Sequence, residues 1–117
     1  MKPQMYQLSI SPSCQRVFPV LAAKGVEYEA IEIDITKRNR PEAFQRVSPF
    51  NQVPVMVHDG TAIVGSANIA EYIEEQWPEP ALLPKDPKQR AYARQWMHYA
   101  DSEVQNRQVL FVHVQKE

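Results

Sequence analysis

The stretch SISPSCQRV, from Ser9 to Val17, holds the residues of this chain best suited to nucleophilic chemistry. It contains Cys14, the single cysteine of the sequence, among three serines. A thiol ionises more easily where a helix begins, because free backbone N–H groups there favour negative charge, and a serine hydroxyl can donate a hydrogen bond to the resulting thiolate. Two interpretations stay open: Ser11 and Cys14 form a reactive site, or Ser11 only caps a helix and Cys14 only packs inside it.

Two further positions have features that would suit a ligand. Val53-Pro54 opens an apolar run, although a proline cannot donate to a sheet. A cis bond there would present the Val53 backbone to a peptide-like ligand, whereas an edge strand starting at proline is the plain alternative. Gly65-Ser66 precedes a helical pattern, and Ser66 either caps that helix or offers its hydroxyl and N–H to a carboxylate. Together the three positions would suit a short, acidic, peptide-like thiol.

The periodicity of the sequence predicts the elements that position these residues. The expected strands are 5–10, 26–35, 53–58 and 61–64, and the expected helices are 12–24, 41–47, one from 66 and a long one after 87. Ser11 with Pro12 is a strong helix start, Gly25 a helix stop, and Asp59-Gly60 a two-residue hairpin turn. The order is β-α-β-α-β-β-α, followed by a proline-rich linker and one long helix. This order predicts an α/β unit with a sheet between helices.

Composition excludes several classes of function. The chain has 117 residues and a net charge of 13 − 14 = −1, so it lacks the basic surplus that nucleic acid or an anionic membrane would require. No apolar run approaches the ~20 residues of a membrane span, and no signal peptide is recognisable, which predicts a cytoplasmic protein. One cysteine excludes an intrachain disulfide framework and a Cys-x-x-Cys redox pair. The three scattered histidines have no metal-ligand spacing, so no metal is expected.

The segments SPSCQRV, SPFNQVPVMVHDG and SANIAEYIEEQWPEPALLPKDPKQRA resemble, in order and spacing, the landmarks of the cytosolic glutathione transferases. Residues 1–77 look like their thioredoxin-like, glutathione-binding domain, with a mixed four-stranded sheet. Residues 78–87 look like the linker, and 88–117 like the first helix of an incomplete all-helical domain. The stretch from Gln52 to Arg90 most resembles the zeta class, the maleylacetoacetate isomerases, and related bacterial transferases.

The resemblance implies roles for particular residues. Ser11 matches the serine that hydrogen-bonds the glutathione sulfur, and Ser66 matches the serine that binds the γ-glutamyl carboxylate. Val53 would pair its backbone with the cysteinyl part of glutathione. A basic residue near the second helix, Arg38 or Arg40, would meet the glycine carboxylate. The implied catalytic residue is Ser11, with Cys14 as a secondary candidate, and the implied glutathione-binding residues are Gln52, Val53, the cis-proline Pro54, Gly65, Ser66 and Arg38.

The sequence also departs from the family pattern. The zeta class has Ser-Ser-Cys-Ser where this chain has Ser-Pro-Ser-Cys, so Cys14 takes the place of a serine. Gly65 stands where a glutamate or glutamine usually precedes the serine, which removes one contact to the γ-glutamyl group. The chain appears as a truncated relative that stops after the first helix of the second domain. The apolar face of that helix is therefore expected to pack against a second copy or another chain.

Three hypotheses of function follow. The leading one is a glutathione transferase for alkyl or aryl groups, or a glutathione-dependent isomerase. In it Ser11 and a helix N-terminus ionise the bound thiol for attack on a small electrophile. The second keeps the fold as a catalytically weak or inactive module for protein–protein assembly. The third gives Cys14 a role in mixed-disulfide formation. The expected partners are glutathione, the electrophile and a homodimer contact over 88–117, without nucleic acid or membrane.

Overall fold

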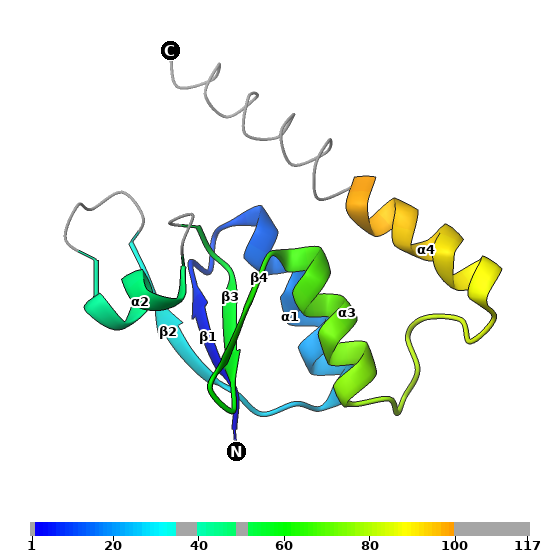
Figure 1. Ribbon diagram of the computed structural model, residues 1–117, viewed down its shortest axis with the longest axis horizontal. Helices are drawn as coiled ribbons and strands as arrows, with labels where there is room; N and C mark the ends of the chain where they lie inside the picture. The colour runs from blue at the N-terminus through cyan, green and yellow to red at the C-terminus, as the bar shows by residue number, and fades with distance from the viewer. Residues whose placement is uncertain (1, 35–39, 49–51, 100–117) are drawn as a thin grey trace, which may run out of the picture. The chain divides into compact units, whose positions relative to one another are not determined.

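The computed structural model describes residues 2–34, 40–48 and 52–99 of the chain. The chain divides into two compact units, Met1–Pro80 and Ala81–Glu117. The first unit contains a sheet with three helices, and the second contains one described helix, α4 (Figure 1).

The first unit has the predicted βαβαββα order. Its elements are β1 (Gln4–Gln7), α1 (Pro12–Lys24), β2 (Glu29–Glu32), α2 (Glu42–Val47), β3 (Val55–His58), β4 (Thr61–Val64) and α3 (Ser66–Gln76). The strands form one sheet in the order β2-β1-β3-β4. β1 pairs with β2 in parallel and with β3 antiparallel, and β3 pairs antiparallel with β4. The predicted mixed four-stranded sheet is thereby confirmed.

The ends of α1 follow from its local sequence. Ser11 is the N-cap in an extended conformation, Pro12 is the first helical residue, and Gly25 ends the helix in the left-handed region at φ 66°. Glycine adopts this conformation without the penalty that a Cβ atom brings. The helix continues through Pro19, which is exposed.

The strands are shorter than the alternation of the sequence predicts. β1 ends at Gln7, because the chain then turns: the Ser11 N–H donates to the Leu8 carbonyl at 2.9 Å. The hairpin agrees with the prediction, since Asp59 (φ 49°) and Gly60 (φ 83°) both have the positive φ of a two-residue turn.

The cap of α3 differs from the sequence-based prediction by one residue. Gly65, and not Ser66, is the N-cap, at φ 96° and ψ 135°. The Gly65 carbonyl accepts the Ile69 N–H at 2.9 Å, which makes Ser66 the first helical residue. Ser66 is buried at the beginning of the helix.

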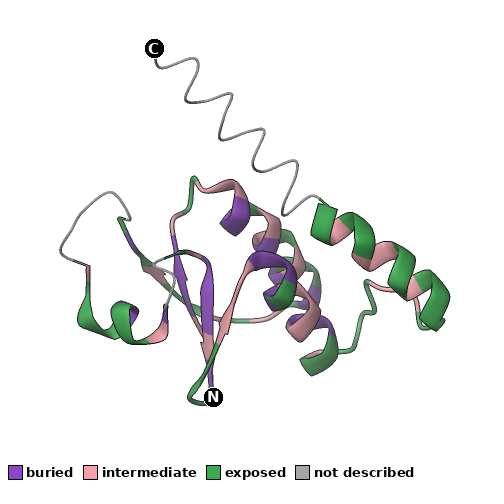
Figure 2. Ribbon diagram, turned by 45° about the horizontal axis from the view of Figure 1, so that its top comes forward, coloured by how far each residue is buried: buried purple, intermediate pink, exposed green. Residues whose placement is uncertain are grey.

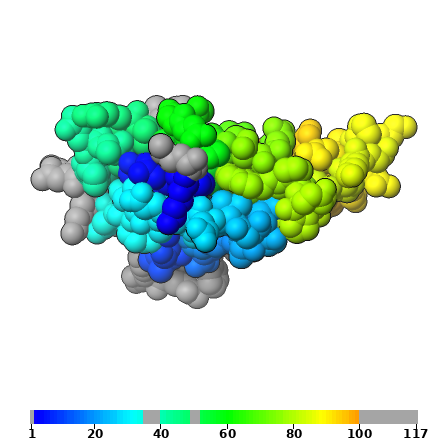
Figure 3. Space-filling model, turned by 90° about the horizontal axis from the view of Figure 1, so that it is seen from below, coloured from blue at the N-terminus to red at the C-terminus, as the bar shows by residue number. Residues whose placement is uncertain are grey.

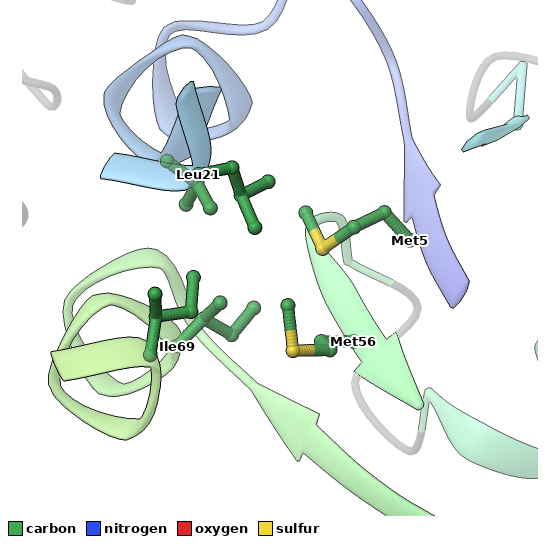
Figure 4. Close-up of a cluster of buried hydrophobic side chains, with 6 residues drawn as sticks. Met5, Leu21, Met56 and Ile69 are labelled. Carbon is green, nitrogen blue, oxygen red and sulfur yellow. The ribbon is translucent and has the colours of Figure 1, made fainter. Parts of the chain in front are cut away.

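Successive residues of β1 and β3 face opposite sides of the sheet, as strand geometry requires. Met5 and Met56 belong to a core cluster under α1 and α3, completed by Val17, Leu21, Ile69 and Ile73 (Figure 4). Their neighbours Tyr6 and Val55 belong to a second cluster on the other face, with Ile33 and with Phe44 of α2. The sheet therefore lies between two layers of helix.

A buried ion pair joins the ends of α1 and α3. Lys24 Nζ bonds to the Glu74 carboxylate and donates to the Pro80 carbonyl oxygen at 2.6 Å. The end of α1 (light blue) lies against the last part of α3 (yellow-green) in the space-filling view of Figure 3. This contact fixes the point at which the chain leaves the first unit.

In the second unit, α4 spans Pro87–Tyr99. Asp86 begins it, because its side chain accepts the Gln89 N–H at 3.1 Å and its carbonyl accepts the Arg90 N–H at 2.8 Å. None of the described residues of α4 is buried, as Figure 2 shows by colour. The remainder of the predicted helix over 88–117 lies outside the described residues.

Candidate functional site at one edge of the sheet

The strand register brings the three predicted positions to one edge of the sheet. Tyr6 pairs with Val55, and Val55 pairs with Val64. The end of β1, the beginning of β3 and the end of β4 therefore lie next to one another. Ser11 comes shortly after the end of β1, Val53-Pro54 directly precedes β3, and Gly65-Ser66 directly follows β4. Figure 1 shows α1 and α3 both beginning at this edge.

Two of the positions are joined directly. The Val53–Pro54 peptide bond is cis, as the resemblance implies. The Gly65 N–H donates to the Pro54 carbonyl oxygen at 3.4 Å, so the start of β3 and the start of α3 share a backbone hydrogen bond. Gln52 is anchored next to them, because the Ser48 hydroxyl bonds both the Gln52 N–H and its carbonyl oxygen at 2.9 Å.

Two helix N-termini at one edge give the site its electrostatic character. The first N–H groups of a helix have no partner within the helix, and the helix dipole is positive at this end. Neither α1 nor α3 has an acidic residue in its first turn. The edge is therefore suited to the negative groups of a ligand, such as a carboxylate or a thiolate.

Ser11 and Cys14 are in contact at the start of α1. The Ser11 side chain makes no capping hydrogen bond, and it hydrogen-bonds the Cys14 sulfur instead. Burial is the main cause that raises the pKa of the Cys14 thiol, and the charge of Glu32 raises it further. Hydrogen bonds to the Leu8 backbone and to Ser11 act in the opposite direction. The net result is a buried cysteine that keeps its proton.

The predicted basic residues lie only partly within the described chain. Arg38 lies outside the described residues. Arg40 is half-buried just before α2, where its carbonyl oxygen accepts a hydrogen bond from Gln45 Nε2 at 2.8 Å. Both stay predictions for the glycine carboxylate of a ligand.

The sequence analysis missed one residue of this edge, Glu32. Because β2 runs parallel to β1, its last residue reaches the same edge as the end of β1. The Glu32 carboxylate accepts the Ser9 N–H at 3.1 Å, the Ser9 hydroxyl, and Gln7 Nε2 at 2.9 Å. The predicted β-α-β order implied parallel strands, but the predicted strand 26–35 ran past Glu32, so no signal in the sequence indicated that this carboxylate lies at the edge.

Two other kinds of site have no support within the described residues. No three His, Cys, Asp or Glu side chains there are grouped so that they could hold a metal ion. No helix of this part of the chain has the length and apolar character needed to cross a membrane.

The sheet order and its helices define a thioredoxin-like domain, and comparison with known proteins specifies the family. Residues 5–81 match the family described as "Glutathione S-transferase, N-terminal domain". The chain belongs to the glutathione S-transferase family through this domain.

Two curated relatives illustrate the similarity. The chain is 40% identical over 114 residues to the maleylacetoacetate isomerase of Mus musculus, and the matched region covers 95% of the chain and 53% of that protein. It is 43% identical over 95 residues to a probable glutathione S-transferase of Nicotiana tabacum, and the matched region covers 80% of the chain and 42% of that protein. The chain thus spans about half the length of the curated relatives it matches.

Solved structures of the same family have the same fold. Rice GST1 in complex with glutathione matches with a TM-score of 0.78 and 30% identity, over 88% of this chain and 48% of that one. A glutathione S-transferase from Rhodospirillum rubrum F11 matches with a TM-score of 0.76 and 35% identity, over 86% and 45% of the two chains.

Proposed function

We propose that this chain binds glutathione at the sheet edge and stabilises its thiolate for attack on an electrophile, as a transferase or a glutathione-dependent isomerase. The observation that carries the proposal is the convergence of Ser11, the cis Val53–Pro54 bond and Ser66 at one edge with two helix N-termini. Membership of the glutathione S-transferase family supports glutathione as the ligand.

Each part of glutathione has a partner of matching chemistry. The γ-glutamyl carboxylate lies at the beginning of α3, with Ser66 and the helix dipole. The cysteinyl part pairs with the Val53 backbone, beside Gln52. The glycine carboxylate meets Arg38 or Arg40, which supply positive charge.

In the reaction, the bound thiol loses its proton to solvent, and the sulfur lone pair forms a bond to an electrophilic carbon. The carbon either releases a leaving group together with its bonding electron pair, or passes the π electrons of a double bond to a neighbouring atom that takes a proton from solvent. Ser11 donates its hydroxyl hydrogen to the thiolate sulfur, and the N-terminus of α1 favours the negative charge. A hydroxyl has a single hydrogen to donate, and in this proposal it goes to the glutathione thiolate. Burial raises the pKa of the Cys14 thiol, which keeps its proton and is not itself the nucleophile.

The test is a calorimetric titration with glutathione and with S-methylglutathione, which has no ionisable thiol. We expect Ser11→Ala to weaken glutathione binding about 10- to 100-fold, the worth of a hydrogen bond to a charged group, and to leave S-methylglutathione binding nearly unchanged. Ser66→Ala should weaken both ligands alike, because both carry the γ-glutamyl carboxylate. Thr61→Ala is the control, since Thr61 lies at the other end of β4.

Wild-type protein that binds neither ligand would refute the proposal. It would favour the second candidate, a catalytically weak or inactive module for protein–protein assembly. The observation in favour of that candidate is Gly65, which offers no side chain at a position next to Ser66. Loss of activity only on Cys14→Ala would instead support a mixed-disulfide role.

A homodimer contact through α4 is a further part of the proposal. Tyr92, Trp96 and Tyr99 recur on one face of the helix, and they are 60%, 54% and 48% exposed. Their rings stack edge-to-face, at 6.2 Å and 6.0 Å between centroids. An exposed aromatic stripe of this kind is typical of an interface. Sedimentation velocity should show a dimer for the wild type and a monomer for Trp96→Glu, while a wild-type monomer would contradict the contact.

A further inference from the structure

The turn between β1 and α1 is held by a carboxylate from the neighbouring strand. Glu32 accepts the Ser9 N–H at 3.1 Å on Oε2, and it accepts the Ser9 hydroxyl and Gln7 Nε2 on Oε1. These three hydrogen bonds lower the pKa of the Glu32 carboxyl below its usual range, and the bond from the Ser9 hydroxyl has the largest effect. Glu32 is therefore ionised at neutral pH, and hydrogen bonds to a charged acceptor are the stronger kind.

Ser9 is also held from the side of α1. Gln15 Nε2 donates to the Ser9 carbonyl oxygen at 3.2 Å. Two residues later, the Ser11 N–H donates to Leu8 and the Ser11 carbonyl accepts the Gln15 N–H, both at 2.9 Å. All polar backbone and side-chain groups of Ser9 thus have partners, and the position of Ser11 is set by a turn that is fixed at Ser9.

We propose that Glu32 is a positioning residue for the Ser11 hydroxyl, acting through Ser9. The inference rests on the proposed function, because it assigns to Glu32 the placement of the hydroxyl that meets the glutathione sulfur. A hydroxyl contributes to thiolate stabilisation only when it is held at hydrogen-bonding distance in the required direction. Glu32 supplies this restraint from β2 without touching the ligand.

The sequence of this chain offers a matched control. Glu29 lies on the same strand, is also exposed, and also bonds a glutamine of β1, since Gln4 Nε2 donates to Glu29 Oε2 at 3.2 Å. It sits at the opposite end of β2, away from the site edge. Glu29→Ala removes the same kind of side chain and the same kind of contact.

The experiment measures glutathione and S-methylglutathione affinity for Glu32→Ala, Glu32→Gln and Glu29→Ala in the full chain. We expect Glu32→Ala to weaken the binding of glutathione about tenfold, which is part of the free energy of a hydrogen bond to a charged group. The same change should weaken the binding of S-methylglutathione less than about twofold. Glu32→Gln keeps one acceptor oxygen and should fall between wild type and Glu32→Ala. Glu29→Ala should bind both ligands like the wild type.

A double-mutant cycle separates positioning from a general structural effect. In a Ser11→Ala background, Glu32→Ala should weaken glutathione no further, because the hydroxyl that it places is absent. Additive losses, or an equal loss for both ligands, would overturn the positioning role.

A measurement without ligand keeps this inference distinct from the proposed function. The Ser9 amide proton should exchange with solvent faster in Glu32→Ala than in wild type, by NMR, and at the wild-type rate in Glu29→Ala. If the wild type binds glutathione but the Ser9 amide proton exchanges at the same rate in Glu32→Ala as in wild type, the role of Glu32 alone is overturned. A wild type that does not bind glutathione would overturn the proposed function and the positioning role together.

Discussion

Replacement of Lys24 by methionine is expected to be among the most destabilising single changes in the first unit. The Lys24 side chain is 0% exposed and that of Glu74 is 6% exposed, so the ion pair is shielded from water. Lys24→Met removes the ammonium group that bonds the buried Glu74 carboxylate, and removal of one partner of a buried ion pair costs about 3–5 kcal/mol of unfolding free energy. The Pro80 carbonyl also loses a charged donor at 2.6 Å.

The magnitude can be checked by urea unfolding and by thermal unfolding, followed by circular dichroism. A loss of this size lowers the melting temperature by roughly 12 °C or more in a unit of this length, at roughly 4–8 °C per kcal/mol. Arg46→Met is the control. Its partner Glu42 is 2.8 Å away, but the two side chains are 71% and 80% exposed, so this change should cost only about 0.3–0.5 kcal/mol.

The double variant Lys24→Met, Glu74→Leu separates the pair from its individual charges. Apolar side chains of similar size can replace a buried ion pair with little loss, so the double variant should be more stable than Lys24→Met alone. Equal losses for Lys24→Met and Arg46→Met would refute the reasoning. The reasoning would also be refuted if the loss of stability in the double variant equalled the sum of the losses in Lys24→Met and Glu74→Leu measured singly.

Three further changes probe other parts of the first unit. Gly65→Ala should lower stability by about 1–3 kcal/mol in urea unfolding, because φ 96° is strained for a residue with a Cβ atom even though the space around it is open; an unchanged midpoint would contradict this. The raised pKa of the buried Cys14 thiol predicts slow alkylation by iodoacetamide at pH 7. Mass spectrometry should show labelling only at a higher pH than free cysteine needs, and rapid labelling at neutral pH would contradict the raised pKa. Tyr72→Phe should cost about 1–3 kcal/mol in thermal unfolding, because the Tyr72 hydroxyl lies 2.5 Å from Nδ1 of the buried His58, and an unaltered melting temperature would show that this contact adds nothing.

Features governed by neighbouring residues were predictable from the sequence. Ser11-Pro12 and Gly25 predicted both ends of α1, and Asp59-Gly60 predicted the hairpin turn. The class of fold followed from the order of these elements. The three segments of the site edge could also be selected, because they occur together in one small α/β unit, although each alone has a plain local explanation such as a helix cap or an edge strand.

Features that depend on distant residues were not predictable. Lys24 and Glu74 are 50 residues apart, and each belongs to a helix whose pattern gives no sign of the other. The contact of Glu32 with Ser9 depends on the register of two parallel strands, which hydrophobic alternation alone does not specify. The same alternation overestimated the length of β1, because it cannot detect the hydrogen bond from the Ser11 N–H to the Leu8 carbonyl that turns the chain.

The place of β1 in the sheet has a consequence for the order in which the protein is synthesised. β1 is the first strand of the chain, yet it lies inside the sheet, between β2 and β3. While a nascent chain emerges, β2 can cover one side of β1, but the other side waits for Val55–His58. Until then an unpaired strand edge is open to pairing with other chains. Nascent chains that stall before residue 55 should therefore aggregate more readily than chains that have completed the β3–β4 hairpin.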